Sequence, residues 1–411
     1  MCKGAENVEA TYTYEEILIQ TIDETYPKYY KQKIIKQLEK DGLVYFTDNL
    51  LEEPGAVDLT FVPEEDQFNT CIEKSSTIIN KIEKMECENS YKYATLFSTN
   101  GYPKQPVEQL INRDLIKVFN SEKFDKDALF RDNSSVIIPT LYEIDEDTTI
   151  LKFSRLLTGY LPVEGMNKRS IKYPILVIFY KDIDVIEIRF DQVKGFLKKH
   201  DEYFYAKQIE LIIDWIEDNL GWEITAIDLN PTIEYISGLE QEEVYVSAQA
   251  MNLKSKKKAV LDTGDNDEDI LPLLGELKEL LKSNREFFEV DIEVTEKLDT
   301  YREMAKRVPE LKDLVTINDE LIEQNLQIKE LLENFILDTE SASDLPWISL
   351  TWKNESKSKA LKVKFSFNYM QKEYSLLQYY FNNKTEMERM NYVTRYLIEN
   401  KTKCDAEFGD E

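Results

Sequence analysis

Histidine is almost missing from this sequence. His200 is the single histidine among 411 residues, so a site of the Ser-His-Asp or Cys-His type would have to use that one side chain. It stands in "GFLKKHDEY", directly before a predicted helix that Asp201 can cap, and this setting is typical of a solvated loop. The sequence therefore weighs against histidine-dependent catalysis.

Cysteine is also scarce, with four residues and no Cys-x-x-Cys pair. Their spacing predicts neither a disulfide framework nor a zinc site. The opening residues, "MCKGAENVEATYTYEE", hold no apolar stretch, and no apolar run in the chain reaches the roughly 18 residues that a membrane span needs. We expect a reduced, cytoplasmic protein with no membrane contact.

Glycine is limited to 12 residues, and the phosphate-binding pattern GxxxxGK does not occur. Two acidic runs, 143–147 and 265–269, lack the glycine-centred spacing of an EF-hand calcium loop. The sequence therefore predicts no bound cofactor and no metal site.

Basic residues are in deficit, because 51 lysines and arginines face 79 aspartates and glutamates and leave a net charge of −28. The molecule as a whole should repel nucleic acid and anionic membranes, and it should suit a basic protein partner. Since 42% of the residues are hydrophobic and 11% aromatic, the chain should nevertheless fold. Its bias towards Lys, Ile, Glu and Tyr is typical of proteins from low-GC bacteria and their phages.

The pattern of elements predicts an α+β protein, with mixed helices and antiparallel hairpins in two or three domains. The clearest unit is central, where Ile175 to Tyr180 is an unbroken apolar run that predicts a strand covered on both faces. A second strand over 185–190 follows, and then a long amphipathic helix that ends at Gly221. The predicted domains are 1–130, 131–292 and 293–411.

Residues 13–62 predict two helices followed by a hairpin. The strands are "LVYFTD" and "AVDLTFV", joined across "EEPG". A helix followed by a two-stranded wing resembles the end of a winged-helix module, which implies that lysines on the helix face nucleic acid. An ordinary amphipathic helix fits the same pattern. The lysines on one side of the second helix are Lys33, Lys36 and Lys40, and the apolar residues on the other are Ile34, Ile35 and Leu38.

A longer amphipathic helix is predicted over residues 310–337. Apolar residues recur along it at steps that keep them on one side: Leu314, Ile317, Leu321, Ile328, Leu331 and Phe335. Such a stripe is typical of a helix seam. The seam can join a homodimer, another partner or a second helix of the same chain.

The last part of the chain is locally basic, since residues 341–403 hold 11 basic and 6 acidic side chains. The strictly alternating "LKVKFSFNY" predicts a strand in a hairpin that precedes a final helix. The lysines of this region are Lys357, Lys359, Lys362 and Lys364. The aromatic residues near them in sequence are Trp347, Trp352, Tyr369, Tyr379 and Tyr380.

Two interpretations of these lysines stay open. Basic side chains interleaved with aromatic ones can follow the backbone of single-stranded nucleic acid while its bases stack. Alternatively, the aromatic residues face the core and the lysines protect an exposed edge strand from aggregation.

The stretch "AVLDTGDND" resembles the catalytic motif of retroviral-type aspartic proteases through Asp262, Thr263 and Gly264. The resemblance implies a β-rich dimer in which two aspartates share a proton. Asp265 follows, however, where that family has a small residue, and the sequence turns helical from Ile270. We interpret the stretch as a solvated acidic turn.

The hairpin "KDIDVIEIRF" suggests a second catalytic arrangement. Asp182, Asp184 and Glu187 could hold magnesium in a nuclease of the Asp…Glu-x-Lys kind. Arg189 stands where the lysine belongs, and an arginine does not give up its proton. We therefore favour a polar strand face that carries a surface ion pair.

These patterns predict a non-catalytic cytoplasmic protein of bacterial or phage origin. It would act through protein–protein contact, with its acidic surface and the long helix meeting a partner. The alternative is a nucleic-acid-binding or processing subunit of a bacterial anti-phage defence system, which would use the lysines of the N-terminal helix or of the C-terminal strand.

Overall fold

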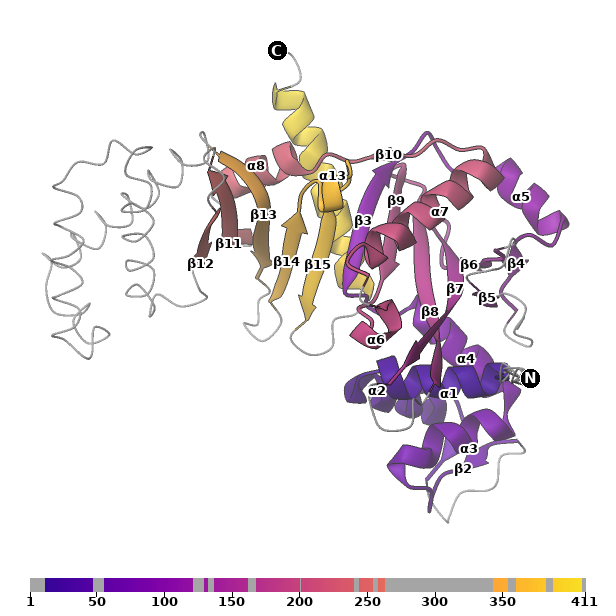
Figure 1. Ribbon diagram of the computed structural model, residues 1–411. Coiled ribbons are helices and arrows are strands. Elements are labelled where there is room, and N and C mark those ends of the chain that lie inside the picture. Colours follow the sequence, from indigo (N-terminus) through magenta and orange to yellow (C-terminus); the bar gives the residue numbers. More distant parts are fainter. Residues whose placement is uncertain are drawn as a thin grey trace, which may run out of the picture. The chain divides into compact units, whose positions relative to one another are not determined.

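The protein folds into two compact units (Figure 1). The first unit holds residues 1–228, 369–374 and 384–411, and the second holds 229–368 and 375–383. Each combines helices with mostly antiparallel strands, so the predicted α+β class is confirmed. The computed structural model describes residues 12–46, 55–120, 129–131, 137–161, 168–199, 201–239, 244–253, 258–262, 343–353, 360–381 and 387–408. The predicted boundary at residue 292 lies outside these ranges, and the division into three domains stays a prediction.

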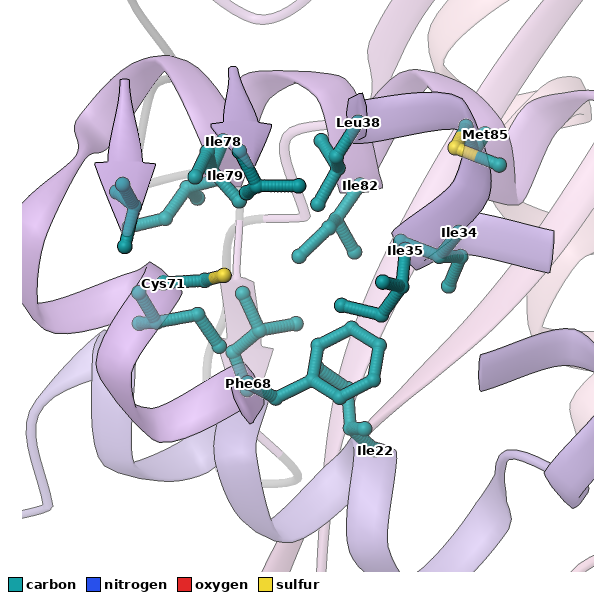
Figure 2. Close-up of a cluster of buried hydrophobic side chains, with 14 of the residues drawn as sticks. Ile22, Ile34, Ile35, Leu38, Phe68, Cys71, Ile78, Ile79, Ile82 and Met85 are labelled. Atoms are coloured by element: carbon teal, nitrogen blue, oxygen red, sulfur yellow. The ribbon is translucent and has the colours of Figure 1, made fainter. Parts of the chain in front are cut away.

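Four helices pack together at the start of the first unit (Figure 2). They are α1 (Tyr14–Thr25), α2 (Lys28–Lys40), α3 (Gln67–Lys74, after the short turn η1, Glu64–Asp66) and α4 (Ser76–Cys87). Each buries a stripe of apolar side chains with helical spacing. Figure 2 shows Phe68 and Cys71 of α3 gathered with Ile82 of α4 in the resulting core.

The predicted hairpin after α2 is wrong. β1 (Val44–Tyr45) and β2 (Val57–Asp58) pair in parallel, with Val44 beside Val57. The Val57 N–H donates to the Leu43 carbonyl and the Leu59 N–H to the Tyr45 carbonyl, both at 2.9 Å. Parallel pairing brings Val44 and Val57 into the helical core together, whereas a tight turn would have required antiparallel strands. These strands therefore do not form the wing of a winged-helix module.

A break at Ser75 separates α3 from α4. Ser75 between them is extended, with φ −146° and ψ 113°. Its N–H closes α3 by donating to the Cys71 carbonyl at 3.1 Å. Serine is a common boundary residue because its side chain competes for backbone hydrogen bonds.

The strands of the first unit pair in the order β10-β3-β9-β8-β7-β6-β4, with β5 beside β7. The pairs β4–β6 and β5–β7 are parallel and the others antiparallel. The predicted strands over 175–180 and 185–190 are confirmed within β8 and β9. The bounds are β3 (Tyr93–Ser98), β4 (Lys117–Val118), β5 (Leu129–Arg131), β6 (Thr140–Glu143), β7 (Thr148–Tyr160), β8 (Lys168–Tyr180), β9 (Val185–Phe190) and β10 (Thr225–Ala226).

The other helical elements of this unit are α5 (Lys104–Asn112), α6 (Gly195–Lys198), α7 (Phe204–Leu220), η5 (Tyr369–Gln371) and α13 (Met387–Phe408). The predicted stop of the long helix is confirmed, because Gly221 follows α7 in the left-handed region with φ 59°. Within the described residues, none of the helices is long and apolar enough to cross a bilayer.

The two faces of this sheet differ in chemistry. On one face, the rings of Phe153 and Trp215 of α7 lie 5.0 Å apart, and those of Phe190 and Tyr205 of α7 lie 5.6 Å apart. On the other face, Thr394 of α13 donates to the Glu187 carboxylate of β9 at 2.8 Å. Because helices contact both faces, β9 is buried at every position. The Ile175–Tyr180 run of β8 is also buried throughout, as predicted for a strand covered on both faces.

Four charged side chains are buried together on the polar face, and we call them the charge cluster. Glu83 and Glu86 of α4 meet Lys152 of β7 and Lys172 of β8, and none of the four is more than 2% exposed. The Lys152 Nζ lies 2.6 Å from Glu83 Oε2, and the Lys172 Nζ lies 2.7 Å from Glu86 Oε2. Each lysine also contacts the other glutamate, so the charges balance.

Tyrosines from the N-terminal helices complete the charge cluster. The Tyr14 hydroxyl donates to Glu83 and the Tyr26 hydroxyl to Glu86. Burial by itself would raise the pKa of Glu83, but the lysine charges outweigh it and lower that pKa from 4.5 to about 2. Because the folded pKa is the lower one, this carboxylate stabilises the fold above about pH 4.5, and the contribution is lost as the pH falls towards 2.

The second unit combines helix α8 (Asn230–Gly238) with an antiparallel sheet in the order β12-β11-β13-β14-β15. The strands are β11 (Val244–Leu253), β12 (Lys258–Asp262), β13 (Ser343–Trp352), β14 (Leu361–Ser366) and β15 (Leu376–Phe381). The predicted C-terminal hairpin and final helix are confirmed as the antiparallel pair β13–β14 and α13, and β15 adds a further antiparallel strand beside β14.

Replacing Glu83 by glutamine should destabilise the first unit strongly. The free energy of unfolding should fall by about 3–5 kcal/mol, because buried lysines lose half of their compensating charge. The control is Glu399→Gln, whose partner Lys403 lies 2.7 Å away on the exposed side of α13 and whose loss should cost less than about 1 kcal/mol. Urea unfolding at pH 7 measures the free energy of unfolding of both variants. Similar small losses of this free energy in the two variants would show that the charge cluster does not hold the unit together.

Replacing Gly159 by alanine should disrupt the contact between β7 and α6. A Cβ at this position would lie 2.5 Å from the Phe196 carbonyl oxygen, so the backbone of α6 would have to move. We expect a loss of about 1–3 kcal/mol, read from the urea midpoint. Gly195→Ala is the control, because a Cβ there meets nothing within 4 Å. Equal midpoints for the two variants would contradict this packing.

Candidate nucleic-acid interface

The lysines of α2 lie on its outer side, as predicted. Lys33, Lys36 and Lys40 are exposed, while Ile34 and Leu38 are fully buried. The helix therefore presents positive charge, but β1 and β2 do not supply the antiparallel wing that the winged-helix resemblance implied.

Several predicted site residues lie outside the described part of the chain. Their roles stay predictions. They are His200, Thr263, Gly264, Lys357, Lys359 and the six positions of the predicted partner helix, Leu314, Ile317, Leu321, Ile328, Leu331 and Phe335.

The predicted surface ion pair of β9 is in fact buried. Glu187 and Arg189 are both fully enclosed, and the Arg189 Nε lies 2.8 Å from Glu187 Oε1. The hydroxyls of Thr394 and Tyr180 lie 2.8 and 2.9 Å from Glu187 Oε2. The prediction failed because α13, from the far end of the chain, covers this strand.

Two acidic residues of the predicted nuclease site, Asp182 and Glu187, have separate partners, and Asp184 accepts the Thr99 N–H through its backbone carbonyl. The Asp182 Oδ1 lies 3.1 Å from the Arg395 Nη2 of α13, in a half-exposed pair, whereas Glu187 is enclosed with Arg189. Across the described residues, no three His, Cys, Asp or Glu side chains gather in a way that could hold a metal ion. Asp182 and Glu187 therefore each form an ion pair within the first unit.

Lys362 and Lys364 lie on β14, where the predicted alternation is confirmed. Leu361, Val363 and Phe365 are buried, and the two lysines between them are half-buried. β14 pairs with β13 on one side and with β15 on the other. The interpretation that these lysines protect an edge strand is therefore wrong.

The register across the sheet places tyrosines beside Lys362. Lys362 lies opposite Thr351 of β13 and Tyr380 of β15, and Thr351 lies opposite Tyr245 of β11. Directly paired residues of antiparallel strands project to the same side of a sheet. Tyr245, Lys362 and Tyr380 therefore share one face.

Two further lysines contact aromatic rings on this face. The Lys364 Nζ lies 4.0 Å from the centre of the Trp347 ring, and the Lys353 Nζ lies 4.7 Å from that of Tyr245. Both distances are within the range of cation–π attraction. We define the lysine–aromatic face as Tyr245, Trp347, Lys353, Lys362, Lys364 and Tyr380. Tyr380 is the most accessible of its rings, at 42% exposed.

The opposite side of the sheet is apolar. Trp352, Phe365 and Tyr379 are buried there, and the rings of Trp352 and Phe365 lie 6.3 Å apart. The aromatic residues that the sequence places near the lysines therefore divide between the two sides. Trp347 and Tyr380 accompany the lysines, while Tyr369 belongs to the first unit.

The cross-strand positions between these lysines and rings hold small or amide side chains. They are Ser349, Thr351, Ser366 and Gln378, none of which is acidic. Farther along the row of Lys364 and Ser349, Ala248 of β11 lies opposite the acidic Asp262 of β12. Thr351 is 3% exposed, and its hydroxyl has no hydrogen-bond partner among the described residues. The lysine–aromatic face thus combines positive charge, aromatic rings and hydrogen-bonding groups.

Comparisons with protein-family models, with curated proteins and with solved structures gave no match. The interpretation of the lysine–aromatic face therefore depends on its geometry.

Reasoning from the sequence missed Tyr245 and Lys353. Alternation in "EVYVSAQAM" marks a strand but does not identify its neighbour. Only the pairing of β11 with β13, which includes an irregularity between Val246 and Ala248, brings Tyr245 to the lysines.

Proposed function

We propose that the protein binds single-stranded nucleic acid on the lysine–aromatic face of its second unit. One observation carries the proposal, which is that Lys362 and Lys364 share a sheet face with Tyr245, Trp347 and Tyr380. The lysines would neutralise backbone phosphates, and the accessible ring of Tyr380 would stack on a base.

The spacing on the sheet supports an extended strand as ligand. Lys362 and Lys364 are two residues apart on β14, which separates them by roughly 6.6 Å along the strand. Tyr380 is directly opposite Lys362, so a phosphate and its base can be held together. Bases in a duplex are already stacked and paired, so single strands should bind better than duplexes.

The net charge of −28 limits binding to a local surface. At physiological ionic strength the Debye length is about 8 Å, so acidic groups farther away are largely screened. Phosphates in direct contact with Lys362 and Lys364 are still attracted by the positive charge of these side chains. We therefore expect modest affinity and little binding elsewhere on the molecule.

Replacing Lys362 and Lys364 by glutamate should abolish binding to single strands. Fluorescence anisotropy with labelled oligo(dT) and oligo(U) at about 50 and 200 mM salt gives the affinity and its salt dependence. We expect affinity to fall at least about tenfold, and the logarithmic salt slope to fall by about 0.7 for each phosphate that the variant no longer neutralises.

The matched control is Lys33→Glu with Lys36→Glu, which makes the same charge change on the exposed side of α2. This variant should keep its affinity within about twofold, apart from the longer-range effect of charge. If it loses binding while the β14 variant retains it, nucleic acid binds on α2 and the proposal is wrong.

Replacing Tyr380 by alanine should weaken binding by about 1–3 kcal/mol because one base is no longer stacked, with the salt slope unchanged. Tyr160→Ala is the control, because Tyr160 is 58% exposed but lies at the end of β7 in the first unit. Equal affinities of the two variants would show that the Tyr380 ring does not contact a base.

Contact with a protein partner through the acidic surface and the helix of residues 310–337 is a second proposal. It depends on composition and on residues outside the described ranges. Dimer formation, a cytoplasmic location and service in an anti-phage system are likewise proposals. The molar mass measured by light scattering tests dimer formation.

A further inference from the structure

One hydroxyl on the lysine–aromatic face is buried without a hydrogen-bond partner, and it belongs to Thr351 of β13. The residue is 3% exposed, and its Oγ1 forms no hydrogen bond with any described residue. By contrast, the hydroxyl of Ser247 on the neighbouring strand β11 donates to the Ser349 carbonyl at 3.2 Å. A buried polar group without a partner carries a free-energy penalty, and a ligand that pairs with it removes that penalty.

Thr351 lies in a row of paired residues that crosses the neighbouring strands β11, β13, β14 and β15 (Figure 1). It is opposite Tyr245 on one side and Lys362 on the other, and Lys362 is opposite Tyr380. Directly paired residues have Cα atoms about 5 Å apart and project to the same side of a sheet. Because threonine is shorter than the tyrosine and the lysine that flank it, its hydroxyl lies at the floor of the face between them. From β15 to β13 the row therefore presents an accessible ring, an ammonium group and a hydroxyl, in that order.

The order of ring, ammonium group and hydroxyl matches the order of groups along a single strand of RNA. A phosphate on Lys362 joins two nucleosides. The base of one can stack on the Tyr380 ring, while the ribose of the other lies on the opposite side of the phosphate, over Thr351. The next phosphate can then meet Lys364, about 6.6 Å farther along β14. Only RNA carries a hydroxyl at the 2′ position of that ribose, and this group can both donate and accept a hydrogen bond.

We propose that the single strand bound by the lysine–aromatic face is RNA, and that the Thr351 hydroxyl recognises the 2′-hydroxyl of the ribose beside Lys362. This inference rests on the proposed function, since it concerns the same face. Lys362 is half-buried, and its flexible four-carbon stem lets the ammonium group turn outward to a phosphate and uncover Thr351. The 2′-hydroxyl then pairs with a hydroxyl that no described residue satisfies, so RNA gains affinity that DNA does not.

The test compares three labelled single strands that differ only at the 2′ position, namely oligo(U), oligo(dU) and 2′-O-methyl oligo(U). Anisotropy titrations of the full-length protein at about 50 mM salt give the three dissociation constants. Oligo(U) should bind about fivefold more tightly than oligo(dU), which is the effect of one net hydrogen bond. The 2′-O-methyl strand should bind no better than oligo(dU), because the methyl group blocks the approach to a buried hydroxyl.

Thr351→Val should remove the preference for RNA. Valine has nearly the shape of threonine without the hydroxyl, so this variant should bind oligo(U) and oligo(dU) equally and keep its affinity for oligo(dU) within about twofold. Its melting temperature should not fall, because no hydrogen bond to a described residue is lost. Thr351→Ser keeps the hydroxyl and should keep the preference. The matched control is Thr95→Val, which removes a hydroxyl of β3 in the first unit that is likewise buried and without a partner among the described residues, and it should also keep the preference.

Equal binding of RNA and DNA and the loss of all binding have different meanings. Wild-type affinities for oligo(U) and oligo(dU) within about twofold of each other, or tighter binding of oligo(dU), would overturn the choice of RNA while nucleic-acid binding stands. A preference for oligo(U) that persists in Thr351→Val would overturn the role of this hydroxyl, because another group would then read the ribose. Failure of both strands to bind at about 50 mM salt would overturn the proposed function and this inference with it.

Discussion

The buried contact between two glutamates of α4 and two lysines of the central strands determines how the first unit is assembled. Lys152 and Lys172 lie in a sheet that helices cover, so their charges cannot reach water. Such a lysine is tolerated only where a carboxylate meets it. Glu83 and Glu86 meet this requirement only when α4 is in register with β7 and β8. The charge cluster therefore acts mainly to specify where α4 packs, because desolvation offsets much of its attraction.

Where the sequence predicted structure correctly, the signal was local. The apolar run from Ile175 to Tyr180, the alternation that begins at Leu361 and the stop at Gly221 each reflect contacts within a few residues. The charge cluster could not be predicted in this way, since Glu83 lies 69 residues before Lys152. A lysine in an otherwise apolar strand does call for a carboxylate, but the sequence offers 79 acidic candidates.

The errors about the candidate site also arose because it depends on contacts between residues distant in sequence. Lys362 and Lys364 were identified from the sequence, but their position inside a sheet depends on strand order, which alternation does not reveal. Likewise, Tyr245 joins the lysine–aromatic face through pairing with a strand distant in sequence. The parallel pairing of β1 and β2 replaced a predicted hairpin because core burial outweighed the turn signal.

The lysine–aromatic face is proposed as the one local surface on which this acidic protein binds single-stranded nucleic acid, and photocrosslinking tests this claim most directly. The full-length protein would be irradiated with an oligonucleotide that carries 5-bromouracil, and the adducts would be located by mass spectrometry. We predict adducts on Tyr380, with further adducts on Trp347 and Tyr245. Adducts confined to α2 or to other parts of the first unit, with none on the lysine–aromatic face, would contradict the claim.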